Sequence, residues 1–292
     1  MRFFAIGHVS RDEIGGPWRP GGSAFYAAAA AARLGADATL VAPVGPLELE
    51  TFERECAALG VRLLALDSPV TTIFRRGGGR GGLRWRIGAR APGIGARDVR
   101  EVLERAALAT PAHADVVLLG CIAREIAPDV LEVFRGGSRV LAAQGFLREW
   151  DELGRIEPRE WAEPERLLAE LDAVVVSQED LLGQTGSPAR WSRSTQVVVT
   201  RAAEPAVLWR NGRSLEIPGF PATAVDDVGA GDTFTAALAL ALAEGRPAVE
   251  AVRFAHATAS LRVGGSGLGS LPDRAQVEER LWSAAAAGEP VE

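Results

Sequence analysis

The chain contains no lysine, and all 32 of its Lys and Arg residues are arginine. This absence excludes a phosphate-binding lysine of the P-loop or protein-kinase type, and a lysine that forms a Schiff base. Any phosphate site must therefore use backbone N–H groups, arginine and metal ions. Codon bias in a GC-rich genome produces the same composition, and the exclusion holds for either cause.

Cysteine is scarce as well, because Cys56 and Cys121 are the only two and lie far apart in sequence. A disulfide framework is therefore not expected, and a reducing, cytoplasmic location is predicted. No run of 18 or more apolar residues is present, so we expect no membrane span and no membrane partner. The formal net charge of −6 argues against a nucleic-acid partner.

Short aliphatic segments alternate with Ala-rich or amphipathic segments along the chain. This alternation predicts βαβ units and a mostly parallel sheet with helices on both faces, in a single α/β domain of residues 1–292. The expected strands are 3–7, 39–44, 116–120, 140–143, 173–177 and 197–200. The expected helices are 23–34, 47–59, 96–108, 128–134, 164–171, 232–244, 247–263 and 273–287.

Two segments interrupt the alternation, residues 9–22 and residues 61–92. Both read as extended pieces, the second around a Gly/Arg turn, and together they predict a small β appendage. Ligands of open α/β sheets bind at the carboxyl ends of the strands, so we expect the appendage to be a lid there. An edge hairpin of the main sheet is the alternative.

The most informative segment is 226–234, with the sequence DDVGAGDTF, which a largely apolar run follows. A glycine-rich turn before a helix exposes backbone N–H groups, and a helix N-terminus attracts phosphate. Asp232 at this place is either a helix cap or a base that removes a proton from an alcohol.

This segment resembles the C-terminal signature of the ribokinase (PfkB) family of carbohydrate kinases, D-T-x-G-A-G-D-x-F, and departs from it only at Asp227. Residues 20–28 and 33–35 resemble the family's N-terminal Gly-Gly motif and the helix after it. Gly7 and Asp12 match a glycine and an aspartate that follow the first strand. The resemblance implies a three-layer α/β/α ribokinase-like fold with a mostly parallel sheet and a small β lid.

The resemblance also implies ATP-dependent phosphorylation of a hydroxyl on a small sugar, inositol or nucleoside. Asp232 is then the general base, and the N–H groups of Gly229, Ala230 and Gly231 hold the transferring phosphate. The residues expected to bind substrate are Asp12, Gly21, Gly22, Tyr26, Gln144 and Arg148. Loop and turn roles are the structural alternative for Asp12, Gly21 and Gly22.

Two positions bear on the identity of the substrate. Tyr26 stands where the family often has asparagine, which argues against a simple assignment to ribose. Gln144 and Arg148 resemble a Q-x-x-x-R run of the myo-inositol kinase branch, together with the extended segment 71–74. These two side chains are expected to bind substrate hydroxyls or a phosphate.

The expected nucleotide-binding residues are Ser177, Thr200 and His256, with Gly229 and Gly231. Asp180 is expected to support Mg²⁺ through water, since Ser177 and Asp180 replace the family's N-x-x-E pair. The structural alternatives are a helix N-cap for 177–180 and a packing role for His256. The resemblance adds a monovalent cation as a candidate cofactor and a homodimer through the lid as a candidate assembly.

A second hypothesis comes from a different class of protein. The departures at Ser177, Ala202 and Pro205 also fit a kinase fold that has lost catalysis and binds a ligand for regulation. The intact Gly229–Asp232 turn favours the enzyme.

Overall fold

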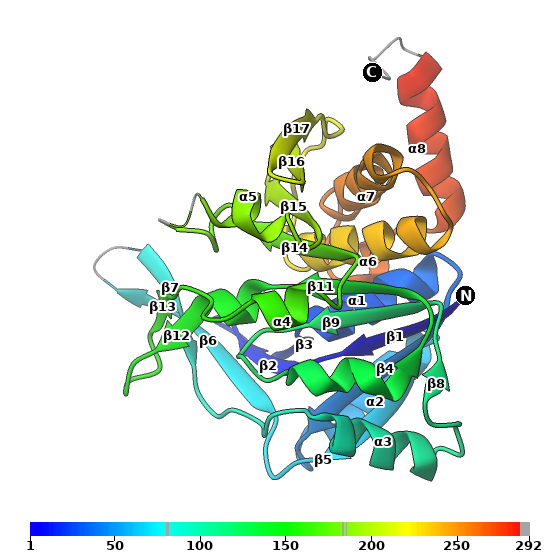
Figure 1. The fold of residues 1–292 in the computed structure, drawn as a ribbon. Helices are drawn as coiled ribbons and strands as arrows, with labels where there is room; N and C mark the ends of the chain where they lie inside the picture. Colours follow the sequence, from blue (N-terminus) through cyan, green and yellow to red (C-terminus); the bar gives the residue numbers. More distant parts are fainter. Residues whose placement is uncertain (80–81, 183, 185, 287–292) are drawn as a thin grey trace.

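A nine-stranded sheet forms the centre of the molecule (Figure 1), with the order β17-β16-β15-β14-β11-β9-β1-β4-β5. The computed structural model describes residues 1–79, 82–182, 184 and 186–286; the tip of the expected lid, 80–81, lies outside this part. The strands of this sheet are β1 (Arg2–Ile6), β4 (Asp37–Val44), β5 (Arg62–Asp67), β9 (Val116–Gly120), β11 (Ser138–Ala142), β14 (Ala173–Ser177), β15 (Gln196–Arg201), β16 (Glu204–Arg210) and β17 (Arg213–Ile217).

Neighbouring strands from β5 to β15 run parallel, and β16 and β17 add an antiparallel edge. All six expected strands are present within a few residues. The edge pair β16 and β17 was not predicted, because its exposed polar side chains break the aliphatic runs that mark the central strands.

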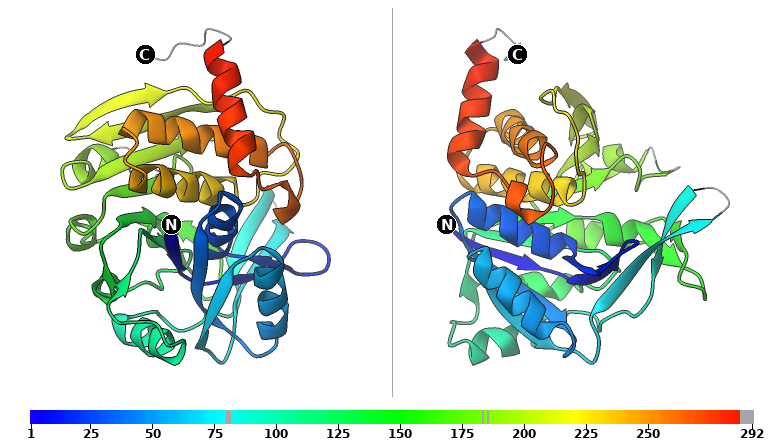
Figure 2. Two further views of the ribbon diagram at one scale, coloured as in Figure 1. Left: turned by 90° about the vertical axis from the view of Figure 1, so that its right-hand side faces the viewer. Right: turned by 180° about the vertical axis from the view of Figure 1, so that it is seen from behind.

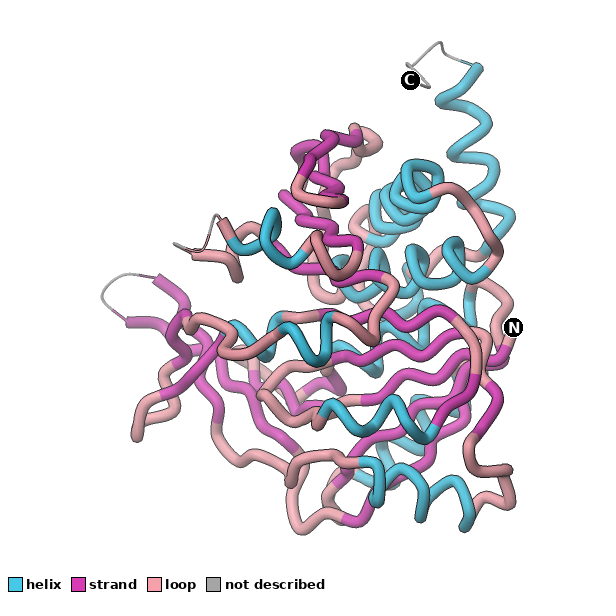
Figure 3. Tube along the Cα trace, in the orientation of Figure 1, coloured by secondary structure: helices cyan, strands magenta, loops and turns pink. Residues whose placement is uncertain are grey.

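Helices cover both faces of the sheet (Figure 3), which confirms the predicted α/β/α layers. One face carries α1 (Ser23–Arg33), α2 (Leu49–Ala58), α6 (Ala230–Ala243) and α7 (Ala248–Arg262), with α8 (Arg274–Ala286) packed against α7. The other carries α3 (Ala96–Arg105), α4 (Glu165–Leu168), α5 (Ser187–Trp191) and the 3-10 segment η1 (Pro128–Val133). No helix in the described ranges is both long and apolar enough to cross a membrane.

Strand β1 shows why both faces need cover. Phe3 and Ala5 point into the core with α1 and α6, whereas Phe4 and Ile6 point into the core with α3. Side chains alternate between the faces of a strand, so a continuous apolar run is typical of a strand buried on both sides.

A separate four-stranded sheet, here called the small sheet, has the order β3-β2-β6-β7. Its strands are β2 (Ser10–Glu13), β3 (Arg19–Gly21), β6 (Thr72–Gly79) and β7 (Gly82–Ile87). It lies beyond the carboxyl ends of the central strands, away from the N-terminus (Figures 1 and 2). The expected lid segment 61–92 is corrected at its start: β5 pairs with β4 in the main sheet, where Leu64 and Leu66 are buried.

Short elements complete the chain: β8 (Ala112–His113), β10 (Phe134–Arg135), β12 (Arg148–Trp150), β13 (Ile156–Pro158), η2 (Gln144–Leu147) and η3 (Leu268–Ser270). Two expected helices differ in kind or length. The one at 128–134 is a 3-10 helix, and the one at 164–171 has only four helical residues, Glu165–Leu168. Helix α6 begins at Ala230, two residues before its expected start.

Candidate active site

A cavity of about 390 Å³ lies between the small sheet and the carboxyl ends of the central strands. Its wall brings together seven residues that the sequence singled out: Asp12, Gly22, Tyr26, Gln144, Arg148, Gly229 and Asp232. Ser10, Ser23, Phe74, Arg76, Trp85, Ile122, Glu179, Asp227 and Val228 complete it. The wall therefore carries four carboxylates and two guanidinium groups.

The turn before α6 presents unpaired backbone N–H groups beside this cavity. Ala230 N–H is used inside the turn, where it donates to Asp227 O at 3.1 Å. The N–H groups of Gly229, Gly231 and Asp232 make no backbone hydrogen bond within the described residues. Since these groups lie at the start of a 14-residue helix, the turn is suited to an anion.

Gly229 allows the turn to lie directly on the ring of Tyr26. Its φ is 77°, and a Cβ there would come within 2.4 Å of Tyr26 Cδ1. The tyrosine is buried, and burial together with the nearby Asp12 and Asp232 raises its pKa to about 12. Tyr26 therefore supports the turn as a neutral phenol.

Asp232 stands in the first turn of α6 and accepts a hydrogen bond from Ser23 Oγ at 2.5 Å. Burial raises the pKa of Asp232, while the Ser23 hydroxyl and the charge of Arg148 oppose that rise. A carboxylate whose pKa is raised towards the working pH is a better general base. Ser23 was not among the predicted site residues, and only its place after the Gly-Gly pair pointed to it.

Asp12 faces the same cavity from β2 and accepts a hydrogen bond from Ser10 Oγ at 2.7 Å. Burial raises the pKa of Asp12 to about 6, against the Ser10 hydrogen bond, and the negative Asp232 adds to the rise. Gly21 makes room for this carboxylate, because a Cβ at Gly21 would lie 2.2 Å from Asp12 Oδ2. Asp12 is thus placed to accept hydrogen bonds from a polyhydroxylated ligand.

A buried carboxylate ties together the loops that carry this end of the cavity. Glu125 accepts hydrogen bonds from the backbone N–H groups of His8, Ile122 and Ala123, at 2.6 to 3.1 Å. These bonds join the carboxyl ends of β1 and β9. They compensate for burying the carboxylate and fix the loop that leads to β2, where Asp12 lies, and the loop that carries Ile122.

Arg148 and Asp180 bind each other. Arg148 Nη2 lies 2.8 Å from Asp180 Oδ1, and Ser177 Oγ donates to Asp180 Oδ2 at 2.6 Å. Asp180, expected to support Mg²⁺, therefore has both oxygens engaged, and Ser177 serves the same cluster. Arg148 lines the cavity, whereas Asp180 does not. Asp180 is therefore linked to the cavity through Arg148, and its carboxylate is not part of the cavity wall.

Two other carboxylates of the cavity wall are better placed for a divalent cation. Glu179 and Asp227 line the cavity and make no hydrogen bond or ion pair to another described side chain. No group of three or more His, Cys, Asp or Glu within the described ranges is arranged to hold a metal. One or two carboxylates suffice for Mg²⁺ when phosphate and water supply the other ligands, so Glu179 and Asp227 fit such an ion.

Thr200 and His256 lie outside the residues that line the cavity. Thr200 is the last residue of β15 that pairs with β14, and its hydroxyl donates to Val176 O at 3.5 Å. His256 is buried in α7, where its ring packs edge-on against Phe234 at 5.2 Å. Burial lowers the pKa of His256 to about 4, so the ring is neutral and packing is its visible role.

The small sheet contributes an aromatic and cationic wall to the cavity. Phe74 and Trp85 meet edge-on at 6.3 Å, and the Arg76 guanidinium lies 5.6 Å from the Trp85 ring centre. An aromatic wall of this kind can cover the apolar face of a ring-shaped ligand.

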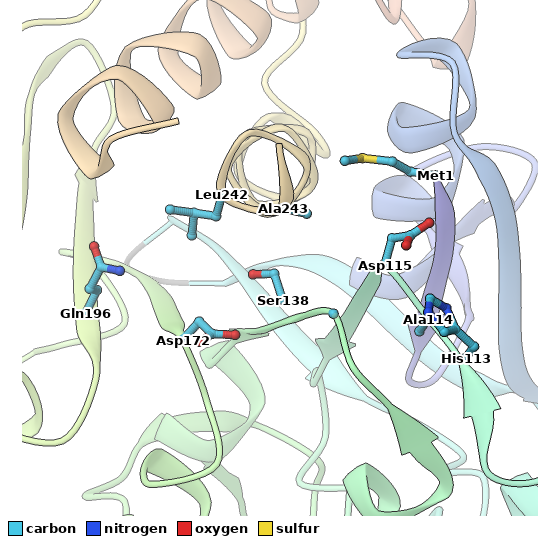
Figure 4. A pocket seen from close by; sticks show the side chains of 10 residues that line it. Met1, His113, Ala114, Asp115, Ser138, Asp172, Gln196, Leu242 and Ala243 are labelled. Atoms are coloured by element: carbon cyan, nitrogen blue, oxygen red, sulfur yellow. The ribbon is translucent and has the colours of Figure 1, made fainter. Parts of the chain in front are cut away.

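A larger cavity lies at the opposite, amino end of the strands (Figure 4). Its wall includes Asp115 and Asp172, near the end of α6 at Leu242 and Ala243. Both carboxylates are engaged, since Asp115 accepts from Arg2 N–H and Asp172 from Arg139 N–H. These bonds order the starts of β1 and β11, and the expected site residues lie at the other end.

The sheet order and the cavity at its carboxyl end define an open α/β protein with a site at the strand ends. Residues 161–274 match the family model described as pfkB family carbohydrate kinase. The chain is 54% identical to the ribokinase of Bacillus subtilis over 66 residues and 36% identical to that of Arabidopsis thaliana over 134 residues. These matches cover 22% and 40% of this chain, and 22% and 35% of those proteins. Over part of its length the chain is thus similar to pfkB family carbohydrate kinases and to ribokinases.

Solved structures agree with this fold over nearly the whole chain. A pyrophosphate-dependent kinase of the ribokinase family, complexed with a pyrophosphate analogue and myo-inositol, matches with a TM-score of 0.76 and 22% identity, over 95% of this chain and 99% of that one. The ribokinase of Arabidopsis thaliana complexed with ribose and ATP matches with a TM-score of 0.71 and 24% identity, over 96% of this chain and 98% of that one.

Proposed function

We propose that this protein is a phosphotransferase that moves a phosphoryl group onto a hydroxyl of a small, uncharged polyol, sugar or inositol, with Asp232 as general base. The observation that carries the proposal is that Asp232, Gly229 of the turn and Asp12 line one cavity. A phosphate site alone or a hydroxyl site alone fits many proteins. A base that shares one cavity with both sites fits phosphoryl transfer.

The proposed reaction is a direct in-line transfer. An acceptor hydroxyl bonds to Asp232, loses its proton to that carboxylate and forms the new oxygen–phosphorus bond as the bond to the leaving phosphate oxygen breaks. The N–H groups of Gly229, Gly231 and Asp232 stabilise the charge on the transferring group. Glu179 and Asp227 would hold Mg²⁺, which would supply positive charge to the donor phosphates.

The charge of the wall favours an uncharged acceptor. Four carboxylates face two guanidinium groups, and the Arg148 charge is already paired with Asp180. A phosphorylated acceptor would meet net repulsion. The structural likeness to a kinase solved with myo-inositol, and the Gln144 and Arg148 pattern, support inositols among the acceptors to test.

ATP is the proposed donor, and the likeness to a ribokinase solved with ATP supports it. Other similar structures are of pyrophosphate-dependent kinases, so the assay needs both donors. The decisive experiment incubates the protein with Mg²⁺, each donor and a panel of sugars, inositols and nucleosides, and detects the phosphorylated product by ³¹P NMR. Product with wild type and a loss of about 10²–10⁴-fold with Asp232→Asn is expected. The exposed Asp37 supplies the matched control, Asp37→Asn.

A ligand-binding protein without catalysis is the second candidate. Thr200 and His256 lie outside the cavity wall, and Asp180 is engaged by Arg148, so these three residues offer no free group to the cavity. This candidate predicts calorimetric binding of a panel member and no phosphorylated product with either donor.

A further inference from the structure

A monovalent cation is a cofactor that the family resemblance implies, and its fit can be tested on the turn before α6. A cation that stabilises such a turn needs a cage of oxygen atoms that replaces its hydration shell. The structure contains a cage of this kind beneath the turn. The side chain of Arg262 fills it.

Arg262 stands at the end of α7 with its side chain fully buried. Its Nη1 donates to Ser270 Oγ at 2.9 Å, Gly265 O at 3.2 Å and Asp226 O at 3.4 Å. Its Nη2 donates to Val228 O at 2.6 Å and Asp226 Oδ2 at 3.4 Å. Five oxygen atoms from the turn and from the 265–270 loop thus surround one guanidinium group.

These contacts hold the backbone that presents the anion-binding amides. Val228 O precedes Gly229 directly, so the shortest of the five bonds fixes the peptide whose N–H belongs to Gly229. Asp226 is held as well, since its carboxylate accepts from Val228 N–H and Gly267 N–H. Arginine suits this position because its planar group offers several donors in fixed directions, which a lysine ammonium cannot match.

The charge of Arg262 also reaches the cavity. Tyr26 underlies Gly229, and its pKa is raised by burial and by the carboxylates of Asp12 and Asp232, whereas Arg262 opposes that rise. A phosphate on the turn would therefore lie near a positive charge that no solvent ion has to supply. The cage is occupied and buried, so a monovalent cation does not fit there without displacing the arginine.

We infer that Arg262 is a built-in cation that positions the phosphate-binding turn, so that phosphoryl transfer by this protein needs no added monovalent cation. The inference rests on the proposed function for its catalytic consequence. It is a statement about positioning, because Arg262 contacts the turn and not the reacting atoms.

The first test compares wild-type turnover in potassium, sodium and tetramethylammonium salts at constant ionic strength and fixed Mg²⁺. We expect kcat and both KM values to agree within about twofold across the three salts, since one factor of two is less than about 0.5 kcal/mol. A rise of about tenfold in kcat with potassium alone would overturn the inference.

The second test uses Arg262→Gly, which empties the cage, and Arg262→Lys, which keeps the charge. We expect Arg262→Gly to lose about tenfold or more in kcat with a smaller change in the acceptor KM, and to regain activity with guanidinium or potassium ions. Arg262→Lys should retain an intermediate kcat. Arg97→Ala, which removes an exposed arginine paired only with Glu101, is the control and should show no rescue. Unchanged kcat in Arg262→Gly contradicts the inference.

A binding measurement separates this inference from the proposed function. If wild type forms no product with any donor, the proposed function fails, and pyrophosphate binding is then measured by calorimetry in the same three salts. Equal affinity in all three supports Arg262 as the resident cation, and potassium-dependent affinity refutes it. The same measurement decides the matter if Arg262→Gly does not fold.

Discussion

Ser23 Oγ donates a 2.5 Å hydrogen bond to Asp232 Oδ1 across 209 positions of the chain. The bond joins the first residue of α1 to the first turn of α6, and its acceptor is the carboxylate proposed as the base. A hydrogen bond to the ionised form of a carboxylate lowers its pKa. Ser23 therefore favours the ionised form of Asp232 and opposes the burial that raises its pKa.

Removing that hydroxyl should move the pH dependence of the reaction. In Ser23→Ala the acid limb of kcat/KM is expected to shift to higher pH by about one to two units, because such a bond is worth about 1.5–3 kcal/mol and one unit is 1.36 kcal/mol. Ser23→Thr keeps a hydroxyl and should stay near wild type. A pH–rate profile of Ser23→Ala that overlays the wild type contradicts this role.

The ionised carboxylate of Asp12 should lower the free energy of unfolding at neutral pH. Its pKa rises on folding from 3.8 to about 6, so the folded state binds the proton more tightly than the unfolded chain does. The cost is absent below pH 3.8, grows as the pH rises and is complete above about pH 6. At 1.36 kcal/mol per unit it reaches about 3 kcal/mol.

Asp12→Asn removes this cost but also a hydrogen-bond acceptor for the substrate. Its free energy of unfolding relative to wild type should therefore increase between pH 4 and pH 7, while turnover falls about tenfold or more. Denaturant titrations at several pH values measure the first effect. For Asp37→Asn, at an exposed position, the difference in free energy of unfolding from wild type should not change with pH. A pH-independent difference for Asp12→Asn would refute the raised pKa of Asp12.

Gly229→Ala should destabilise the turn and the protein. The φ of 77° costs an alanine about 1–3 kcal/mol, and the new Cβ would meet the Tyr26 ring at 2.4 Å. A fall in melting temperature with loss of turnover is expected. Gly231→Ala is the matched control, since no atom lies within 4 Å of its Cβ position, and its melting temperature should stay near wild type. Equal melting temperatures for the two variants would contradict the contact with Tyr26.

The Arg148–Asp180 pair should act on both stability and the base. Arg148→Met leaves the nearly buried Asp180 carboxylate unpaired, and losing one partner of a buried pair costs up to about 3–5 kcal/mol. It also removes a charge that lowers the pKa of Asp232, so the acid limb of kcat/KM should move to higher pH.

A double-mutant cycle separates the two effects. Arg148→Met/Asp180→Asn should recover much of the lost stability, because the unpaired charge is gone. The shift in the pH–rate profile should be smaller than in Arg148→Met, because the Asp180 charge, which raises the pKa of Asp232, is removed as well. Additive stability losses in the double variant would show that the pair is not coupled.

Much of the site could be read from contiguous residues. Gly229, Gly231 and Asp232 lie in one turn, so their order in the chain already placed a carboxylate at a helix start beside free N–H groups. The strands β1, β9 and β14 were also predictable, since strands buried on both faces are continuous aliphatic runs.

Contacts between distant segments could not be read in the same way. Asp180 was expected to serve a metal, but its oxygens are engaged by Arg148 and Ser177, and the pairing with Arg148 depends on how two loops meet. Strand β5 was assigned to the lid, because its alternation of exposed and buried residues suits either sheet until its partner β4 is known.

The sequence by itself limited the chemistry that can be proposed: without lysine, a phosphate site is expected at the N–H groups of the glycine turn, and the aliphatic periodicity required a mostly parallel α/β sheet. Only the tertiary structure decided which groups act together. It placed Ser23 on Asp232, Tyr26 under Gly229 and Arg262 beneath the turn. The reason is physical: local patterns follow from backbone geometry, whereas the pKa of a carboxylate and the occupant of a cage depend on burial and on partners brought together by folding.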